Sequence, residues 1–379
     1  MTSDGSYISR VAVAPSDSGF FVAYSAFCSG SSSEVFVNHI AFDGTLAQTA
    51  GDCSAVRGVR ASNSGSLPSR QPALAAEGGR RAGLVWAEAT GAAGADLNLA
   101  EVTLEQAGTL RVSAPLRVSR VYSFYPQNNP EGHNAYGDVA LLGTDGFFTV
   151  LTDGTNVDNE HAHIRLVQPG GGGALEVTGS GVDLGRSNFG EAAVARVGAN
   201  HAVAWSLETN PSPRQTFIQF FSSTQQPLRA QPAALESGFE INLMAMEGNE
   251  LGMTYAMEAA GATLEVHAVT LTVAGNPVLS GNPFTVPNTQ GQYGSAYAGD
   301  GELLMVVADS SDNKTRLHQV DIRNGARCGA LVVYDSNDGV AAAAAVSGEY
   351  LLVLVRHGPN NDPADSSRVD AHILRRQRG

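Results

Sequence analysis

One pattern of residues recurs seven times along the chain and constrains its fold more than any other feature. Each copy has an apolar strand, a turn that usually carries glycine, a second and more apolar strand that ends in a large residue, and an alternating third strand. The ends of the second strands lie about 55 residues apart on average, a period that suits four short strands per copy. These end residues are Tyr24, Trp86, Leu151, Trp205, Tyr255, Val307 and Val355.

The first strand of each copy is built mainly from small residues. Residues 11–14 read Val-Ala-Val-Ala, and residues 192–195 read Ala-Ala-Val-Ala. Small side chains suit the innermost position of a ring, where seven strands crowd around a channel. The third strands, such as 34–40, alternate as half-buried strands do. We therefore predict an all-β fold, a seven-bladed β-propeller with four-stranded antiparallel blades around a central channel.

The repeat accounts for the whole chain, so we predict a single domain over residues 1–379. The last copy ends in its third strand, and we expect either a thin last blade or closure of the ring by residues 1–6. One or two β-sandwiches are the alternative fold, but near-constant spacing over seven copies is not typical of them. The predicted blades span 7–66, 67–133, 134–186, 187–237, 238–290, 291–336 and 337–379.

The seven copies resemble β-propellers in general, over essentially the whole chain, and no single propeller family. The Gly-His and Trp-Asp signature of WD40 blades is absent, and so is the sialidase-type box Ser-x-Asp-x-Gly-x-x-Trp, of which 16–20 (Ser-Asp-Ser-Gly-Phe) keeps little. The resemblance implies a fold and leaves the function open, because propellers include enzymes, lectins and scaffolds.

The charge of the chain narrows the choice of partners. It has 37 acidic against 23 basic residues and a formal net charge of −14. An acidic surface repels phosphate backbones, so we expect no nucleic-acid partner. No apolar run approaches the roughly 18 residues of a membrane-spanning helix, so we expect no insertion into a membrane.

The three cysteines suggest an oxidising compartment. Cys28 and Cys53 fall within the first copy, and we predict a disulfide between them, with two free thiols as the alternative. Cys328 lies in an apolar segment, where we expect it in the core. A disulfide indicates an extracellular, periplasmic or cell-envelope location, although no signal peptide is visible after Met1.

The longest polar loops belong to the third copy. One, 121–136, leads into its innermost strand, and the other, 153–163, joins its second and third strands. Both loops should lie on one face of the ring, and long polar loops on a rigid scaffold are where binding sites usually lie. We name as binding candidates Tyr122, Phe124, Tyr125, Asp153, Asp158 and Glu160.

Histidines in and beside these loops could carry chemistry. His161 and His163 are two residues apart, so on a strand they point to the same face, and His133 could reach them from the other loop. Imidazoles beside carboxylates can form a divalent-metal site or an acid/base pair. The candidates for a metal site are His133, His161 and His163, and Tyr136 joins them as a catalytic candidate.

Three functions stay open. The first is a non-catalytic secreted or cell-envelope binding or scaffold propeller that recognises a protein or a glycan through its loop face, and the lack of a known catalytic motif favours it. The second is a carbohydrate-active enzyme, a polysaccharide lyase or hydrolase with its site in blade 3. The third is a structural subunit of a larger assembly. We predict no cofactor, with a divalent metal at blade 3 as the alternative, and the sequence leaves the oligomeric state open.

Overall fold

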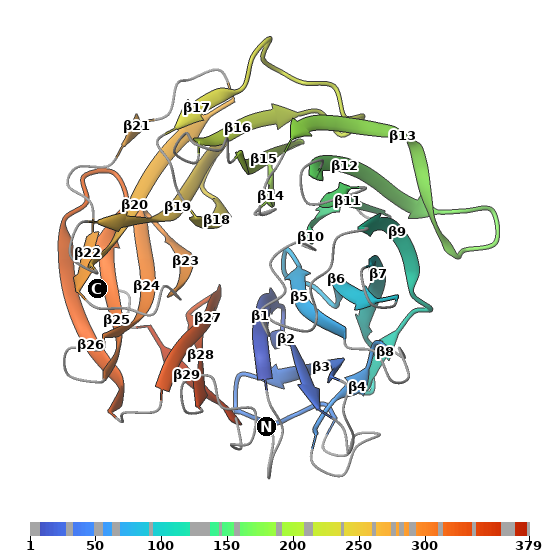
Figure 1. The fold of residues 1–379 in the computed structure, drawn as a ribbon. Coiled ribbons are helices and arrows are strands. Elements are labelled where there is room, and N and C mark those ends of the chain that lie inside the picture. Colours follow the sequence, from blue (N-terminus) through green and yellow to red (C-terminus); the bar gives the residue numbers. More distant parts are fainter. Residues whose placement is uncertain are drawn as a thin grey trace.

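The computed structural model is a ring of seven antiparallel β-sheets, and it confirms the predicted seven-bladed propeller (Figure 1). The described residues form strands and turns, and none of them forms a helix that could span a membrane. The structure describes residues 8–27, 33–48, 56–62, 69–90, 94–121, 137–143, 146–154, 160–186, 192–207, 215–235, 239–259, 263–273, 278–279, 284–287, 293–309, 314–335, 339–357 and 368–376.

Each blade begins with an inner strand at the channel and proceeds outward. The strands of the first three blades are β1 (Ile8–Ser16), β2 (Gly19–Phe27), β3 (Ser33–Ala41) and β4 (Val59–Arg60); β5 (Ser69–Ala75), β6 (Arg81–Ala89), β7 (Ala95–Leu104), β8 (Leu110–Val112) and β9 (Leu116–Val121); β10 (Gly137–Leu142), β11 (Gly146–Gly154), β12 (Glu160–Pro169) and β13 (Leu175–Arg186).

The later blades repeat this order. Their strands are β14 (Ala192–Val197), β15 (Asn200–Leu207), β16 (Gln215–Phe221) and β17 (Ala233–Leu235); β18 (Phe239–Ala245), β19 (Glu250–Ala259), β20 (Thr263–Thr272), β21 (Val278–Leu279) and β22 (Phe284–Pro287); β23 (Tyr293–Gly299), β24 (Glu302–Asp309), β25 (Lys314–Asp321) and β26 (Arg327–Asp335); β27 (Gly339–Ser347), β28 (Tyr350–His357) and β29 (Arg368–Arg375).

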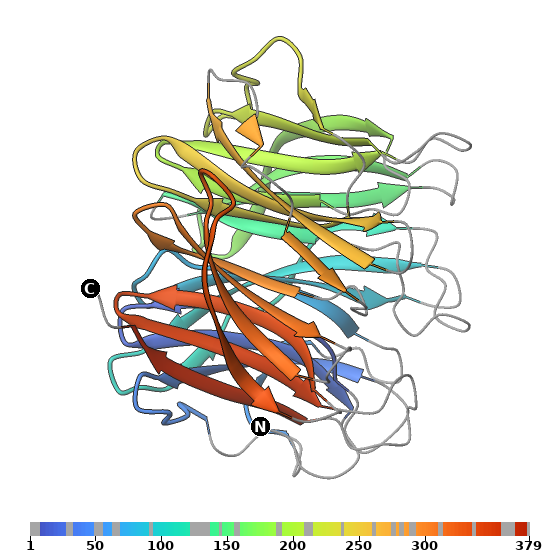
Figure 2. The same cartoon turned by 90° about the vertical axis from the view of Figure 1, so that its left-hand side faces the viewer.

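The core of the molecule lies between the blades. The buried apolar side chains of the described residues fall into seven clusters, and each cluster joins two neighbouring blades. The alternation of each strand makes this arrangement necessary, because successive side chains face opposite sides of a sheet and each side meets another blade. The blades are therefore stacked side by side around the ring, with their strands running across its thickness (Figure 2).

Close approach of neighbouring inner strands demands glycine at one position. A Cβ atom on Gly294, in β23, would lie 2.9 Å from backbone atoms of Ala343 and Ala344 in β27. Contacts this short cannot be relieved by turning a side chain, because the atoms met belong to the backbone. Glycine at this position therefore lets blades 6 and 7 meet at the channel.

The ring closes where the first blade meets the last. Phe20 and Tyr24 of blade 1 share one apolar cluster with Leu352 and Leu354 of blade 7. The rings of Phe42 and Tyr350 stack with their centroids 4.3 Å apart. The described part of the last blade has three strands. Residues 1–6 lie outside the described residues, so their predicted part in closure stays a prediction.

Blades 2 and 3 are joined in a way that the sequence pattern did not indicate. Val121, at the end of β9, pairs with Gly154, at the end of β11, in a short parallel contact. This contact merges the two blades into one nine-stranded sheet. The pairing depends on two residues that are far apart in sequence, and neither strand carries a local signal for it.

Two expectations for the cysteines have different outcomes. Cys328 is exposed on β26, so its predicted place in the core was wrong. The physical reason is that β26 is the outermost described strand of blade 6 and packs against blade 7 only in part: Val333 lies against the apolar cluster of blades 6 and 7, whereas Cys328 is exposed. Cys28 and Cys53 lie outside the described residues, and their disulfide stays a prediction.

Candidate functional site

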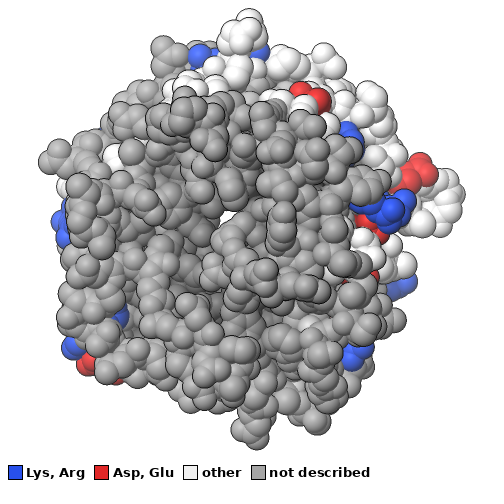
Figure 3. All heavy atoms as spheres, viewed as in Figure 1, with Lys and Arg blue, Asp and Glu red and all other residues white. Residues whose placement is uncertain are grey.

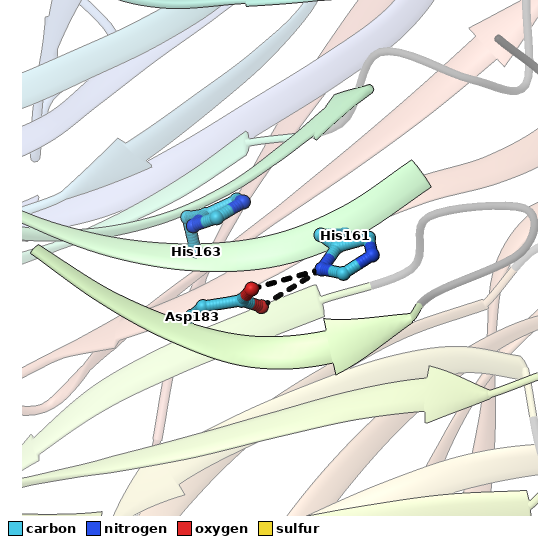
Figure 4. A group of neighbouring side chains, drawn as sticks. All are labelled: His161, His163 and Asp183. Carbon is cyan, nitrogen blue, oxygen red and sulfur yellow. Dashed lines mark hydrogen bonds and ion pairs between the residues drawn. The ribbon is translucent and has the colours of Figure 1, made fainter. Parts of the chain in front are cut away.

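Three side chains that can bind metal lie together on the outer strands of blade 3. They are His161 and His163 on β12 and Asp183 on β13, and we call them the blade 3 cluster. One ligand atom from each lies within 4.8 Å of the ligand atoms of the other two. Figure 4 shows the imidazoles along β12 and the carboxylate of Asp183 turned toward His161.

The alternation of β12 determines which way the histidines face. Ala162 and Ile164 are fully buried in the apolar cluster that joins blades 3 and 4. His161 and His163 alternate with them and therefore lie on the other face of the strand. Their rings are nearly parallel, at an interplanar angle of 20°, with centroids 6.0 Å apart.

A bulge in β13 sets the position of Asp183. His161 pairs with Arg186, and His163 pairs with Asp183. Two steps along β12 thus correspond to three steps along β13, so β13 carries one extra residue. Gly185 lies within this bulge at a φ of +95°, a left-handed conformation that favours glycine. The bulge presents Asp183 to the histidine face of β12.

Hydrogen bonds hold the Asp183 carboxylate in place. The backbone N–H of Gly185 donates to its Oδ1 at 2.7 Å. Nδ1 of His161 lies 3.0 Å from each of its two oxygens. Desolvation raises the pKa of Asp183, but the hydrogen bonds from Gly185 and His161 and the charge of His163 outweigh it and lower that pKa overall. Asp183 is therefore a carboxylate at neutral pH.

The cluster is accessible to solvent. The side chain of His161 is 38% exposed, and that of Asp183 is 53% exposed. An ion pair at this exposure contributes little to stability.

The cluster lies near the junction of blades 2 and 3. Within the ladder, His161 pairs with Asp153, the residue before Gly154. Gly154 in turn pairs with Val121. Val121 and Gly154, after which the two long loops of blade 3 follow, are therefore neighbours.

The predicted site residues are described to different degrees. His161 and His163 lie together as expected. Asp153 and Glu160 are strand residues of β11 and β12 for which the backbone alone is described. The remaining candidates lie outside the described residues, and their roles stay predictions: Tyr122, Phe124, Tyr125, His133, Tyr136 and Asp158.

Asp183 was missed by reasoning from the sequence. The candidates predicted from the sequence belong to the two long loops and the strand beside them, whereas Asp183 belongs to the fourth strand of blade 3, β13. A local signal did exist, because 181–185 reads Gly-Val-Asp-Leu-Gly, and glycine inside a strand often marks a bulge that redirects a side chain.

The channel holds a separate cavity of about 550 Å³, which the inner strands of all seven blades line. Alanine is its most frequent lining residue, and Glu77 and Arg196 form an ion pair of 2.7 Å between blades 2 and 4. None of the three cluster residues lines this cavity. Figure 3 shows that the described charged side chains visible from this side lie around the rim of the ring.

Comparisons with known proteins support the fold. No family model matches the chain, and no curated protein matches it. A protein of unknown function from Dyadobacter fermentans matches with a TM-score of 0.52 at 10% identity, over 100% of this chain and 97% of that one. At this identity the likeness concerns the fold alone.

Two further solved structures are similar at lower scores. A subtype N10 neuraminidase-like protein of A/little yellow-shouldered bat/Guatemala/060/2010 has a TM-score of 0.49 at 11% identity, over 98% of this chain and 96% of that one. The GH43_1 enzyme from Xanthomonas citri has a TM-score of 0.36 at 10% identity, over 63% of this chain and 87% of that one.

Proposed function

We propose that this protein is a non-catalytic binding propeller, which recognises a protein or a glycan beside the junction of blades 2 and 3. The observation that carries the proposal is the blade 3 cluster, in which two imidazoles and a carboxylate are held on rigid strands and stay open to solvent. Polar side chains fixed on a rigid element are suited to recognition, because little conformational entropy is lost when they bind.

The arrangement of the loops supports the same surface. The two long loops of blade 3 follow paired positions at the ends of β9 and β11, Val121 and Gly154. Segments that are joined to a rigid sheet at such positions commonly carry binding residues. We therefore propose that the ligand binds near this junction. The setting that we propose is extracellular or the cell envelope, as the expected disulfide indicates.

The charge of the protein restricts the ligand. At a formal net charge of −14, the surface repels polyanions and attracts cationic partners, whereas a neutral partner meets no electrostatic barrier. The proposal thus names a protein with a basic or neutral surface, or a neutral glycan.

Binding to arrayed glycans and to immobilised secreted proteins tests the proposal. Wild-type protein would be compared with Asp183→Asn and with His372→Ala, a control that alters a histidine of β29 in blade 7. We expect a ligand whose affinity falls at least about tenfold in Asp183→Asn and stays unchanged in the control. A ligand that binds both variants as well as wild type would refute the proposed surface. Turnover of any arrayed glycan would replace the binding function with the enzymatic alternative.

A second candidate function, as a subunit of an assembly, rests on one observation at blade 6. The outer strand β26 exposes Leu331 by 53% and Val332 by 43%, and within the described residues no strand pairs with its outer edge. Exposed apolar edges favour association. If this edge is an interface, light scattering should show an oligomer that Leu331→Lys dissociates, whereas a wild-type monomer at high concentration would exclude self-assembly through it.

A further inference from the structure

The blade 3 cluster has the donor set of a transition-metal site. It offers two imidazole nitrogens, from His161 and His163, and the carboxylate oxygens of Asp183. Imidazole is a good ligand for Zn²⁺, Cu²⁺, Ni²⁺ and Fe²⁺, whereas Ca²⁺ and Mg²⁺ prefer sites made of oxygen atoms alone. The ligands therefore select one class of ion.

The distances suit an ion of this class. A tetrahedral ion with bonds of about 2.1 Å holds its ligand atoms roughly 3.4 Å from one another. His161 and Asp183 are already 3.0 Å apart, and the three ligand atoms lie within 4.8 Å. Closing the set requires a shift of about 1.4 Å at most, which partly exposed imidazoles can make by rotating about χ1 and χ2.

The bulge of β13 orients the carboxylate of Asp183. In metal sites, hydrogen bonds from surrounding groups orient the ligands in the same way. The Gly185 N–H bonds Oδ1 of Asp183 at 2.7 Å, so the carboxylate is oriented by the strand itself and not only by His161. Such outer hydrogen bonds fix the direction of a ligand and commonly determine affinity.

We infer that His161, His163 and Asp183 bind one divalent transition-metal ion of the zinc class. Three protein ligands leave at least one coordination position open, and His161 and Asp183 are exposed enough for an outside molecule to reach an ion that they hold. Water or a donor group of an outside ligand completes the coordination. The inference does not depend on the proposed function, because an ion can bind here whether or not a protein or glycan does.

Titration calorimetry of untagged protein after removal of metal by a chelator tests the site. We expect one equivalent of Zn²⁺ to bind wild type, and no heat from Ca²⁺ or Mg²⁺ at equal concentration. Asp183→Asn, which keeps the size of the side chain, should weaken Zn²⁺ at least about tenfold, and His161→Ala/His163→Ala should abolish it. His372→Ala should bind Zn²⁺ as wild type does.

A second readout separates loss of ligands from loss of fold. Co²⁺ bound to wild type should show the intense visible absorption of a four- or five-coordinate ion, and Asp183→Asn should weaken Co²⁺ while its circular dichroism stays that of wild type. The site is overturned if wild type binds no Zn²⁺, if the double variant keeps the same stoichiometry, or if Ca²⁺ competes equally. Glycan and protein binding is measured separately, so failure of the metal site and failure of the proposed function are distinguishable.

Discussion

Buried histidines hold neighbouring elements together inside the ring. His39 is buried, and its Nε2 lies 2.7 Å from Oγ of Ser16. His201 is also buried, stacks on Phe148 of blade 3 and lies 3.0 Å from the carbonyl oxygen of Leu141. Burial lowers the pKa of both imidazoles. The folded protein therefore keeps these rings neutral under conditions in which the unfolded chain protonates them.

This burial makes stability depend on pH. Burial, together with the charge of Arg80, lowers the pKa of His39 from 6.5 to about 4. The stability contribution is complete above pH 6.5 and is lost as the pH falls toward 4, because the unfolded chain binds the proton first. We expect the free energy of unfolding in urea to drop by up to about 3 kcal/mol over this window on account of His39. His39→Gln should flatten the curve, whereas parallel curves for the two proteins would show that His39 is not responsible.

The sequence predicted the two histidines of the site but not Asp183. The spacing of His161 and His163 predicted their common face, because alternation on a strand is a local property. Asp183 lies 22 residues from His161 and meets it because β13 holds one extra residue. That register is set by pairing between strands, which the amino-acid pattern indicates only through the glycines around Asp183.

The inner strands of neighbouring blades must approach one another closely to form the channel. Gly294→Ala would place Cβ 2.9 Å from the backbone of β27. We expect a loss of about 1–3 kcal/mol in the free energy of unfolding, because two inner strands must separate. Gly329→Ala on the exposed strand β26 meets no atom within 4 Å and serves as the control. Equal stability of the two variants in thermal unfolding would contradict the proposed packing.

The order of strands could be predicted because it depends on local patterns, whereas the packing of the outer strands depends on residues far away in the sequence. Apolar alternation and glycine turns predict inner, second and third strands in every blade, because each depends on residues near in sequence. The outer strands are less regular. β9 also contacts blade 3, and β26 leaves Leu331 and Cys328 exposed. Their environment depends on which blade lies beyond them, and an apolar run alone did not reveal it.

Contacts between the first and the last blade close the ring. The apolar cluster between blades 1 and 7 unites segments from the two ends of the described chain. Oγ of Ser347 donates to the carbonyl oxygen of Ser16 at 2.7 Å, which adds a polar contact at the same boundary. The first and last blades thereby support each other.

Stacking across the closure should be measurable as a coupling energy. Phe42 and Tyr350 stack at 4.3 Å across this boundary. A double-mutant cycle with Phe42→Ala and Tyr350→Ala should give a coupling of about 0.5–1.5 kcal/mol in urea unfolding. Strictly additive effects of the two substitutions would show that the boundary does not depend on this pair.

The ring holds the three side chains of the inferred metal site, His161, His163 and Asp183, together on the outer strands of blade 3. Anomalous diffraction at the zinc absorption edge, from crystals grown with Zn²⁺, tests this site most directly. We expect a peak about 2.1 Å from a nitrogen of His161, a nitrogen of His163 and an oxygen of Asp183, and loss of that peak in His161→Ala/His163→Ala. A wild-type crystal with zinc bound only elsewhere, or with none, would contradict it.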